Sequence, residues 1–155
     1  MMTSISSVSL FLDLSWTQSA TLLALYLLIV LYLILVSAIV SRRVYLNLFR
    51  GHPAHQFSVN AEELTSFDQR LCRAHANLYE NAPLWCGVLL LALITHQESV
   101  TDSLALYFCL ARYMQVITHL TSVSARAVTA RFVFFSTQLI ILAIWMIKLG
   151  DVWFT

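Results

Sequence analysis

Apolar residues occupy long runs of the chain, and the first run is the clearest. Residues 20–40 contain no charged side chain. A helix rises about 1.5 Å per residue, so this run reaches about 30 Å, the thickness of the hydrocarbon core of a bilayer. The run predicts a transmembrane helix over residues 20–41, which ends at the basic pair Arg42 and Arg43.

Three further spans are predicted at residues 71–95, 103–123 and 132–149. The apolar run 84–95 is too short to cross a bilayer alone, so the second span must begin near residue 71 and contain Pro83, which membrane helices tolerate. Continuous apolar runs, rather than alternating ones, argue against a β-barrel. The pattern predicts an all-α, integral membrane four-helix bundle in up-down-up-down order, with residues 1–155 as a single domain.

Composition agrees with a membrane protein and excludes other classes. Hydrophobic residues make up 59% of the chain and charged residues 11%, whereas a soluble domain carries about 25% charged residues. The formal net charge of +1 offers no field for binding nucleic acid. Cys72, Cys86 and Cys109 show no metal-ligand spacing and are interpreted as small buried hydrophobes, so no metal site is expected.

Basic residues predict the orientation in the membrane. The first and third links are basic, whereas the second link carries only Glu98 and Asp102 and the N-terminal tail carries Asp13. The basic residues in question are Arg42, Arg43, Arg50 and Arg70 for the first link, and Arg126 and Arg131 for the third. The positive-inside rule predicts that links one and three are cytoplasmic and that both termini are not; Lys148 is a weak exception.

The second span carries a polar stripe. Arg73, Asn77 and Glu80 are spaced i, i+4 and i+7, with Arg70 at the edge of the same stripe. Charges at the centre of a membrane helix cost about 2.5–3.5 kcal/mol each, so this stripe must face other helices or a wet cavity. Two interpretations stay open. One is a structural network, in which Arg73 pairs with Glu80 and Asn77 bonds across helices; the other is a polar site whose arginines grip ligand carboxylates.

The third span carries a second polar face. Arg112, Gln115 and His119 are spaced i, i+3 and i+7 and share one side of a helix. Counted from the same end of the bundle, Arg112 and Glu80 reach comparable depth. An ion pair between them is therefore one alternative, and a role in ligand binding is the other.

Residues 73–83 read R-A-x-x-N-x-x-E-x-x-P. This motif resembles the second-helix signature of the membrane-associated proteins in eicosanoid and glutathione metabolism (MAPEG). The resemblance extends over almost the whole chain, through its length, its four spans, its basic links and Arg112. It implies a homotrimer that binds glutathione as co-substrate between subunits at the cytoplasmic side, and a lipophilic small-molecule substrate that enters from the membrane lipid.

The resemblance also implies roles for individual residues. Glutathione would be bound by the residues of the two polar faces, namely Arg70, Arg73, Asn77, Glu80, Arg112, Gln115 and His119. An arginine that opens the fourth helix would stabilise the thiolate, because a free thiol has a pKa of about 8.5. Arg131 directly precedes an apolar run and is predicted to open that helix, with Arg126 as the alternate. Several family members carry Tyr where this chain has His119.

The expected function is that of a membrane-bound glutathione-dependent transferase or peroxidase, and there are three alternatives. The first is a non-catalytic lipid-binding or scaffold member of the same family. The second is haem binding by His75 and His119, which is disfavoured because His75 lies about 200° around the helix from Arg73. The third is a metal site at His52 and His55, which is more simply interpreted as a solvated loop.

Overall fold

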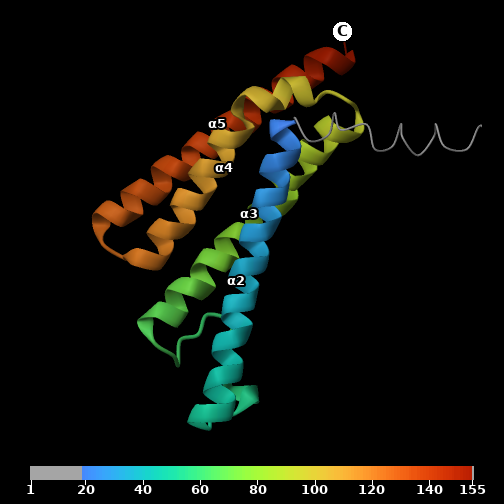
Figure 1. Ribbon diagram of the computed structural model, residues 1–155. Coiled ribbons are helices and arrows are strands. Elements are labelled where there is room, and N and C mark those ends of the chain that lie inside the picture. The colour runs from blue at the N-terminus through green and yellow to red at the C-terminus, as the bar shows by residue number, and fades with distance from the viewer. Residues whose placement is uncertain (1–18, 155) are drawn as a thin grey trace, which may run out of the picture.

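The computed structural model describes residues 19–154, which form four long helices and a short 3-10 helix (Figure 1). Asp13, used above to predict orientation, lies outside the described residues. The helices are α2 (Ala20–Arg50), α3 (Ser66–Ile94), α4 (Glu98–Thr121) and α5 (Ala125–Phe154), with the 3-10 helix η2 at Ala54–Gln56. The prediction of an all-α four-helix bundle is confirmed.

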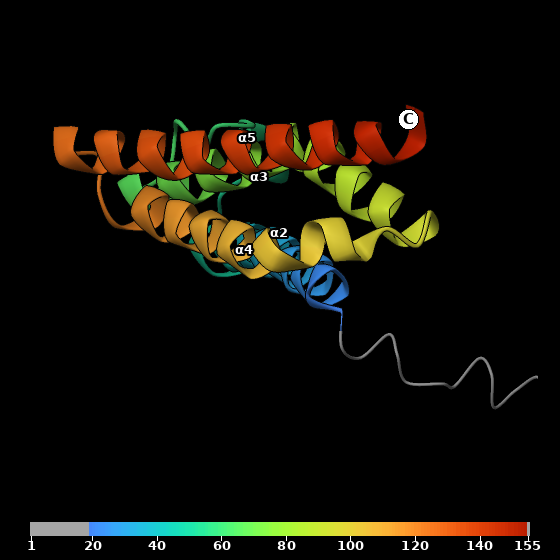
Figure 2. The same ribbon diagram turned by 90° about the horizontal axis from the view of Figure 1, so that it is seen from above.

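Helices α3 and α4 each contact the three other long helices (Figures 1 and 2). The short connections make successive helices antiparallel, so α2 ends and α5 begins at the same end of the molecule. Of the nine Lys and Arg residues of the chain, seven belong to this end, and Arg112 and Lys148 do not. We call it the basic end.

Three of the four helices are long and apolar enough to cross a membrane unaided, namely α2, α3 and α5. Helix α4 covers residues 103–121 of the third predicted span and begins five residues before it, but its composition does not qualify it by the same measure. The reason is the row of polar residues that it carries, among them Arg112 and Gln115, which are buried inside the bundle. The other helices shield these groups, as is usual for polar residues at membrane depth.

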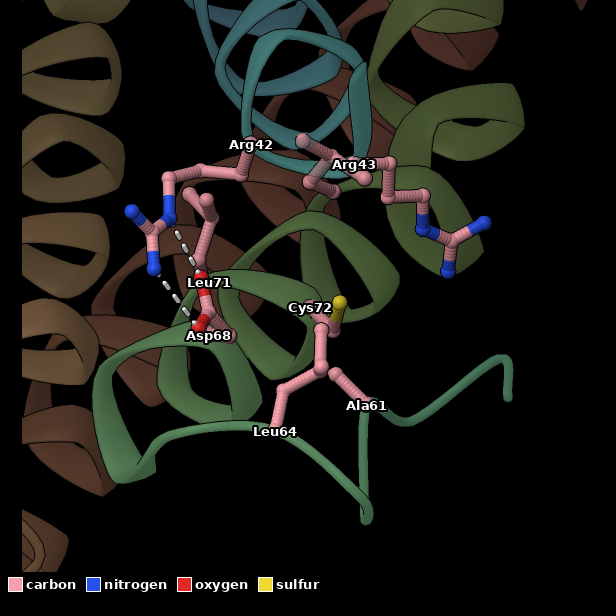
Figure 3. A pocket seen from close by; sticks show the side chains of 8 residues that line it. Arg42, Arg43, Ala61, Leu64, Asp68, Leu71 and Cys72 are labelled. Atoms are coloured by element: carbon pink, nitrogen blue, oxygen red, sulfur yellow. Dashed lines mark hydrogen bonds and ion pairs between the residues drawn. The ribbon is translucent and has the colours of Figure 1, made fainter. Parts of the chain in front are cut away.

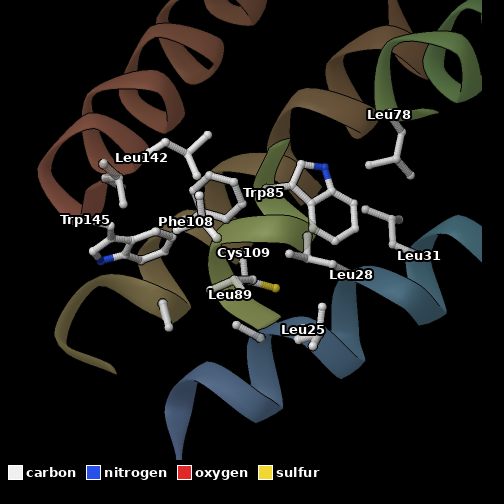
Figure 4. Packing of buried hydrophobic residues seen from close by; sticks show 14 of the residues in the cluster. Leu25, Leu28, Leu31, Leu78, Trp85, Leu89, Phe108, Cys109, Leu142 and Trp145 are labelled. Carbon is white, nitrogen blue, oxygen red and sulfur yellow. The ribbon is translucent and has the colours of Figure 1, made fainter. Parts of the chain in front are cut away.

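Leucine and aromatic side chains fill the bundle between the helices (Figure 4). Phe108 of α4 packs against Trp145 of α5 with 5.4 Å between ring centroids, and both side chains are fully buried. Trp85 and Leu89 of α3 meet Leu28 of α2 in the same cluster. Since lipid tails are as apolar as leucine, close van der Waals packing rather than water exclusion holds these helices together within the bilayer.

The first two helices extend further toward the basic end than the apolar runs indicated. Helix α2 continues past residue 41 to Arg50 and is capped by Gly51 at φ 67°. Helix α3 begins at Ser66, with the Thr65 side chain accepting a hydrogen bond from the backbone N–H of Asp68, and continues through Pro83 as predicted. Consequently, the basic pair predicted to end the first span lies within α2.

An ion pair joins these two extensions. Arg42 donates to Asp68 from Nε at 2.8 Å and from Nη2 at 3.1 Å, one bond to each carboxylate oxygen (Figure 3). Such a forked contact fixes the direction of both side chains. It sets the register between the end of α2 and the start of α3, from which the polar stripe continues.

The start of α5 differs from the prediction. The fourth span was expected from residue 132, with Arg131 at its opening and Arg126 in the preceding link. Instead α5 begins at Ala125, and the hydroxyl of Ser124 accepts a hydrogen bond from the backbone N–H of Ala127. The serine cap and a stretch rich in alanine favour a helix here although the stretch is not uniformly apolar. Arg131 therefore lies nearly two turns inside α5, and Arg126 lies in its first turn.

Candidate functional site

A network of amides and one guanidinium lies between α3, α4 and α5. Arg112 is 1% exposed and donates from Nη1 to Asn77 Oδ1 at 3.2 Å and to Gln115 Oε1 at 3.3 Å. Gln115 donates from Nε2 to Asn77 Oδ1 at 3.1 Å. The cross-helix bonds predicted for Asn77 are therefore present, and they tie α3 to α4.

Gln138 of α5 completes this set, and the sequence analysis missed it. It is 1% exposed, and its Nε2 donates to Gln115 Oε1 and to the Phe134 carbonyl, both at 2.9 Å. A signal was available, since Gln138 is an amide within an otherwise apolar run, and such groups at bilayer depth usually face the bundle interior. We call Asn77, Arg112, Gln115 and Gln138 the amide network.

The charge of Arg112 is not neutralised within the part of the chain that the structure describes. Its partners are neutral amide oxygens, and its buried Nε has no hydrogen-bond partner. The ion pair with Glu80 considered above is not formed, because Glu80 is exposed. On a helix, Glu80 lies about 60° around the axis from Asn77, on the outer side of the same stripe.

Arg73 and Glu80 together form an outer polar face on α3. Both side chains are exposed, and neither contacts the other within residues 19–154, so the proposed structural pair between them is also absent. Counted along α3 from Ser66, Arg73 lies about 11 Å and Glu80 about 21 Å from the start of the helix. The stripe thus straddles the surface of the bundle, with Asn77 on the inner edge and the two charges on the outer edge.

Two arginines meet the last turn of α4 at the basic end. Arg70 of α3 donates from Nε to the Leu120 carbonyl at 2.8 Å, which satisfies one of the free carbonyls at the end of that helix. Arg131 of α5 contacts Nδ1 of His119 through Nη1 at 3.1 Å and donates from Nε to the Ala127 carbonyl at 3.2 Å. By contrast, Arg126 is exposed and makes no side-chain hydrogen bond within the described chain.

The two histidines of the haem alternative lie apart in the structure. His75 lies on the opposite side of α3 from the amide network, with its ring 5.2 Å from that of Tyr32 and 6.4 Å from that of Tyr79. His119 instead contacts Arg131, so the two histidines do not converge on one ligand position. Within residues 19–154, no three histidine, cysteine or acidic side chains gather as a metal site.

The architecture and these contacts define a helical integral membrane protein with a buried cation among amides. The family model of the MAPEG family matches residues 21–150, and the chain therefore belongs to this family. Neither the curated proteins nor the solved structures that were compared gave a significant match.

Proposed function

We propose that the protein is a membrane-bound, glutathione-dependent transferase or peroxidase that activates the glutathione thiol for attack on a lipophilic electrophile. The observation that carries this proposal is the guanidinium of Arg112, which is buried among amides without a carboxylate partner in the described chain. A buried cation of this kind is costly unless an anion binds nearby. Family membership makes glutathione the anionic peptide to test.

The residues around Arg112 suit such a ligand. Glutathione carries two carboxylates and one ammonium group, and the outer polar face offers the guanidinium of Arg73 and the carboxylate of Glu80, both exposed. Asn77 lies between this face and the amide network, so it links ligand contacts to the helix packing. In this proposal Arg73, Asn77 and Glu80 bind the peptide, with Arg112 and Gln115 behind them and Arg70 and His119 toward the basic end.

The exposed charges also favour an oligomer. Insertion scales assign about 2.5–3.5 kcal/mol to a charged side chain at the centre of a membrane helix. Glu80 lies near the middle of α3, so an outer polar face left against lipid would be unfavourable. We infer that other copies of the chain cover it, in the homotrimer that the resemblance implies, and that glutathione binds between subunits at the cytoplasmic side. Native mass spectrometry from a mild detergent should find the trimer; a monomer would contradict this arrangement.

Arg131 is the proposed partner of the thiolate. Its guanidinium is held by two contacts and retains an Nη2 group without a partner in the described chain, whereas Arg126 points to the outside. Arg131 lies nearly two turns inside α5, away from the free N–H groups at the start of that helix, so its effect on a thiol rests on the charge of the guanidinium itself. A nearby cation lowers a thiol pKa and increases the thiolate fraction at neutral pH.

An apolar groove offers a route for the second substrate. It lies between α2 and α3, has a volume of about 310 Å³, and is lined by Ile29, Tyr32, Tyr79, Ala82, Pro83, Trp85 and Cys86. Tyr79 directly precedes Glu80 in α3 and lies about 100° around the helix from it, so the groove opens on a neighbouring face of α3. A lipophilic electrophile dissolved in the bilayer could approach the bound thiol through this groove.

The experiment is glutathione binding by protein purified in detergent, read as thiolate absorbance. Arg73→Ala and Glu80→Ala should each weaken binding at least tenfold, which is about 1.4 kcal/mol. Both side chains are exposed in the single chain, so both variants should fold. Glu62→Ala, an exposed carboxylate in the first link, is the matched control and should bind like the parent.

The outcomes separate the proposed enzyme from its alternative. A folded parent protein that binds no glutathione would favour the non-catalytic lipid-binding member. Binding that survives both Arg73→Ala and Glu80→Ala would place the site elsewhere. Loss of thiolate absorbance in Arg126→Ala, with Arg131→Ala unaffected, would transfer the thiolate role to Arg126.

A further inference from the structure

The contact between His119 and Arg131 joins the last turn of α4 to α5. The distance from Arg131 Nη1 to His119 Nδ1 is 3.1 Å, and the His119 ring is half-buried. The same guanidinium donates from Nε to the carbonyl of Ala127, four residues earlier in its own helix. The His119 ring and the Ala127 carbonyl together therefore fix the position of the Arg131 guanidinium.

The chemistry of the two groups determines the proton on the ring. A guanidinium has five N–H donors and no acceptor, so Nδ1 must accept this hydrogen bond. A ring nitrogen accepts only through a free lone pair, which requires neutral imidazole with its proton on Nε2. Protonation of Nδ1 would place a donor against a donor and break the contact.

The charge of the neighbouring guanidinium acts in the same direction. A protonated His119 would place a second positive charge against that of Arg131, whose Nη1 lies 3.1 Å from Nδ1. The neutral ring is the form that this neighbour favours.

We propose that His119 is a positioning residue, held as the neutral Nε2–H tautomer, whose Nδ1 fixes the Arg131 guanidinium in the geometry that serves the thiolate. This inference rests on the proposed function, because it assigns His119 a task through Arg131. Without the Nδ1 acceptor, the guanidinium keeps only the Ala127 carbonyl and gains freedom to turn toward solvent. Its average distance from a bound thiol would increase, and the thiolate fraction would fall.

The tautomer can be measured without any activity. Nitrogen NMR of histidine-labelled protein in detergent distinguishes an N–H ring nitrogen from a bare one, and the His119 signals are assigned by their loss in His119→Asn. The expected result is a protonated Nε2 and a bare, hydrogen-bonded Nδ1 whose shift moves in Arg131→Ala. A proton on Nδ1 would overturn the proposal.

Two substitutions of His119 test the positioning role. Asparagine carries its side-chain oxygen on Cγ, as histidine carries Nδ1, so His119→Asn keeps an acceptor for Arg131, whereas His119→Ala removes it. We expect His119→Ala to lose at least tenfold in thiolate absorbance with a smaller change in glutathione affinity, and His119→Asn to remain within about threefold of the parent. The control is Thr121→Ala, an exposed position in the same turn.

The result distinguishes the inference from the proposed function. Equal thiolate absorbance in His119→Ala and the parent would overturn the positioning role while leaving the enzyme intact. A parent protein with the Nε2–H tautomer but no glutathione binding would overturn the proposed function, and the positioning role with it. Equal losses in His119→Ala and His119→Asn would show that an acceptor for Arg131 is not what matters at this position.

Discussion

Two of the polar clusters that involve α4 satisfy their hydrogen bonds differently. At the end opposite the basic end, the Asp102 carboxylate of α4 accepts bonds from the Ser19 hydroxyl at 3.1 Å, the Thr21 backbone N–H at 2.8 Å and the Thr21 hydroxyl at 2.6 Å. The buried Thr101 hydroxyl lies 2.7 Å from that of Thr21. In the amide network, by contrast, the buried Arg112 Nε and Gln138 Oε1 have no partner in the described chain.

The difference distinguishes a structural cluster from one suited to a ligand. Asp102 places a negative charge at the N-terminus of α2, where free N–H groups and the helix dipole favour it, so the cluster is electrostatically complete. The amide network has the opposite character, since it buries a cation among neutral groups. Buried polar groups without partners are uncommon and call for an explanation, such as a bound ion or ligand.

The largest expected effect is on stability, at the cluster around Asp102, whose hydrogen bonds are satisfied. Asp102→Ala removes the acceptor of three hydrogen bonds between α4 and the start of α2. Bonds to charged groups contribute about 1.5–3 kcal/mol each but are not additive, so we expect a loss of about 3 kcal/mol in the free energy of unfolding. Denaturation in mixed detergent micelles measures this, and the glutathione affinity of the folded fraction should not change.

The neighbouring residue provides the control for this change. Ser103 is exposed and follows Asp102 in α4, so Ser103→Ala should leave the free energy of unfolding unchanged. If Asp102→Ala were as stable as Ser103→Ala, the contrast between the two clusters would be lost.

The next largest expected effect is on glutathione binding, at the amide network. Arg112→Met removes a buried charge while keeping an extended apolar side chain, so the lost bonds to Asn77 and Gln115 are offset by the removed desolvation cost. We expect a free energy of unfolding within about 1 kcal/mol of the parent and glutathione binding at least tenfold weaker. Calorimetric titration with glutathione measures the second quantity. Strong destabilisation without loss of binding would make the amide network a structural feature only.

Sequence patterns predicted the helices better than their ends. The uncharged run at residues 20–40 and the motif at residues 73–83 identified α2 and α3 and indicated the family. Helix ends outside the apolar runs depend on capping residues and on local helix propensity, and neither can be detected from the hydropathy pattern. For that reason the hydropathy pattern does not reveal the Ser124 cap of α5, and it predicts Arg131 at the helix opening, whereas Arg131 lies in the second turn.

The helix face that carries a polar residue could be predicted more reliably than the contacts that the residue makes. The spacing of Arg73, Asn77 and Glu80 correctly placed them near one face of α3, but the rotation of α3 against α4 decides which of them points inward. Asn77 faces α4 and Glu80 does not, so the ion pair with Arg112 could not be excluded from periodicity alone. The contact between His119 and Arg131 likewise depends on how α4 and α5 pack.

The smallest expected effect compares two asparagines on α3, both half-buried and one turn apart. Asn77 Oδ1 accepts bonds from Arg112 and Gln115 of α4, whereas Asn81 donates from Nδ2 to the carbonyl of Asn77 in its own helix at 2.8 Å. Interhelical bonds of this kind contribute about 0.6 kcal/mol on average and up to about 1.7 kcal/mol in membranes. Asn77→Ala should therefore lower the free energy of unfolding by about 1 kcal/mol, and Asn81→Ala should lower it by less.

Asn77→Ala should also weaken glutathione binding, because Asn77 connects the amide network to the outer polar face. If the two substitutions had equal effects on stability and on binding, the bonds from Asn77 to α4 would matter no more than the bond that Asn81 makes within its own helix. The amide network would then not differ in function from the rest of α3.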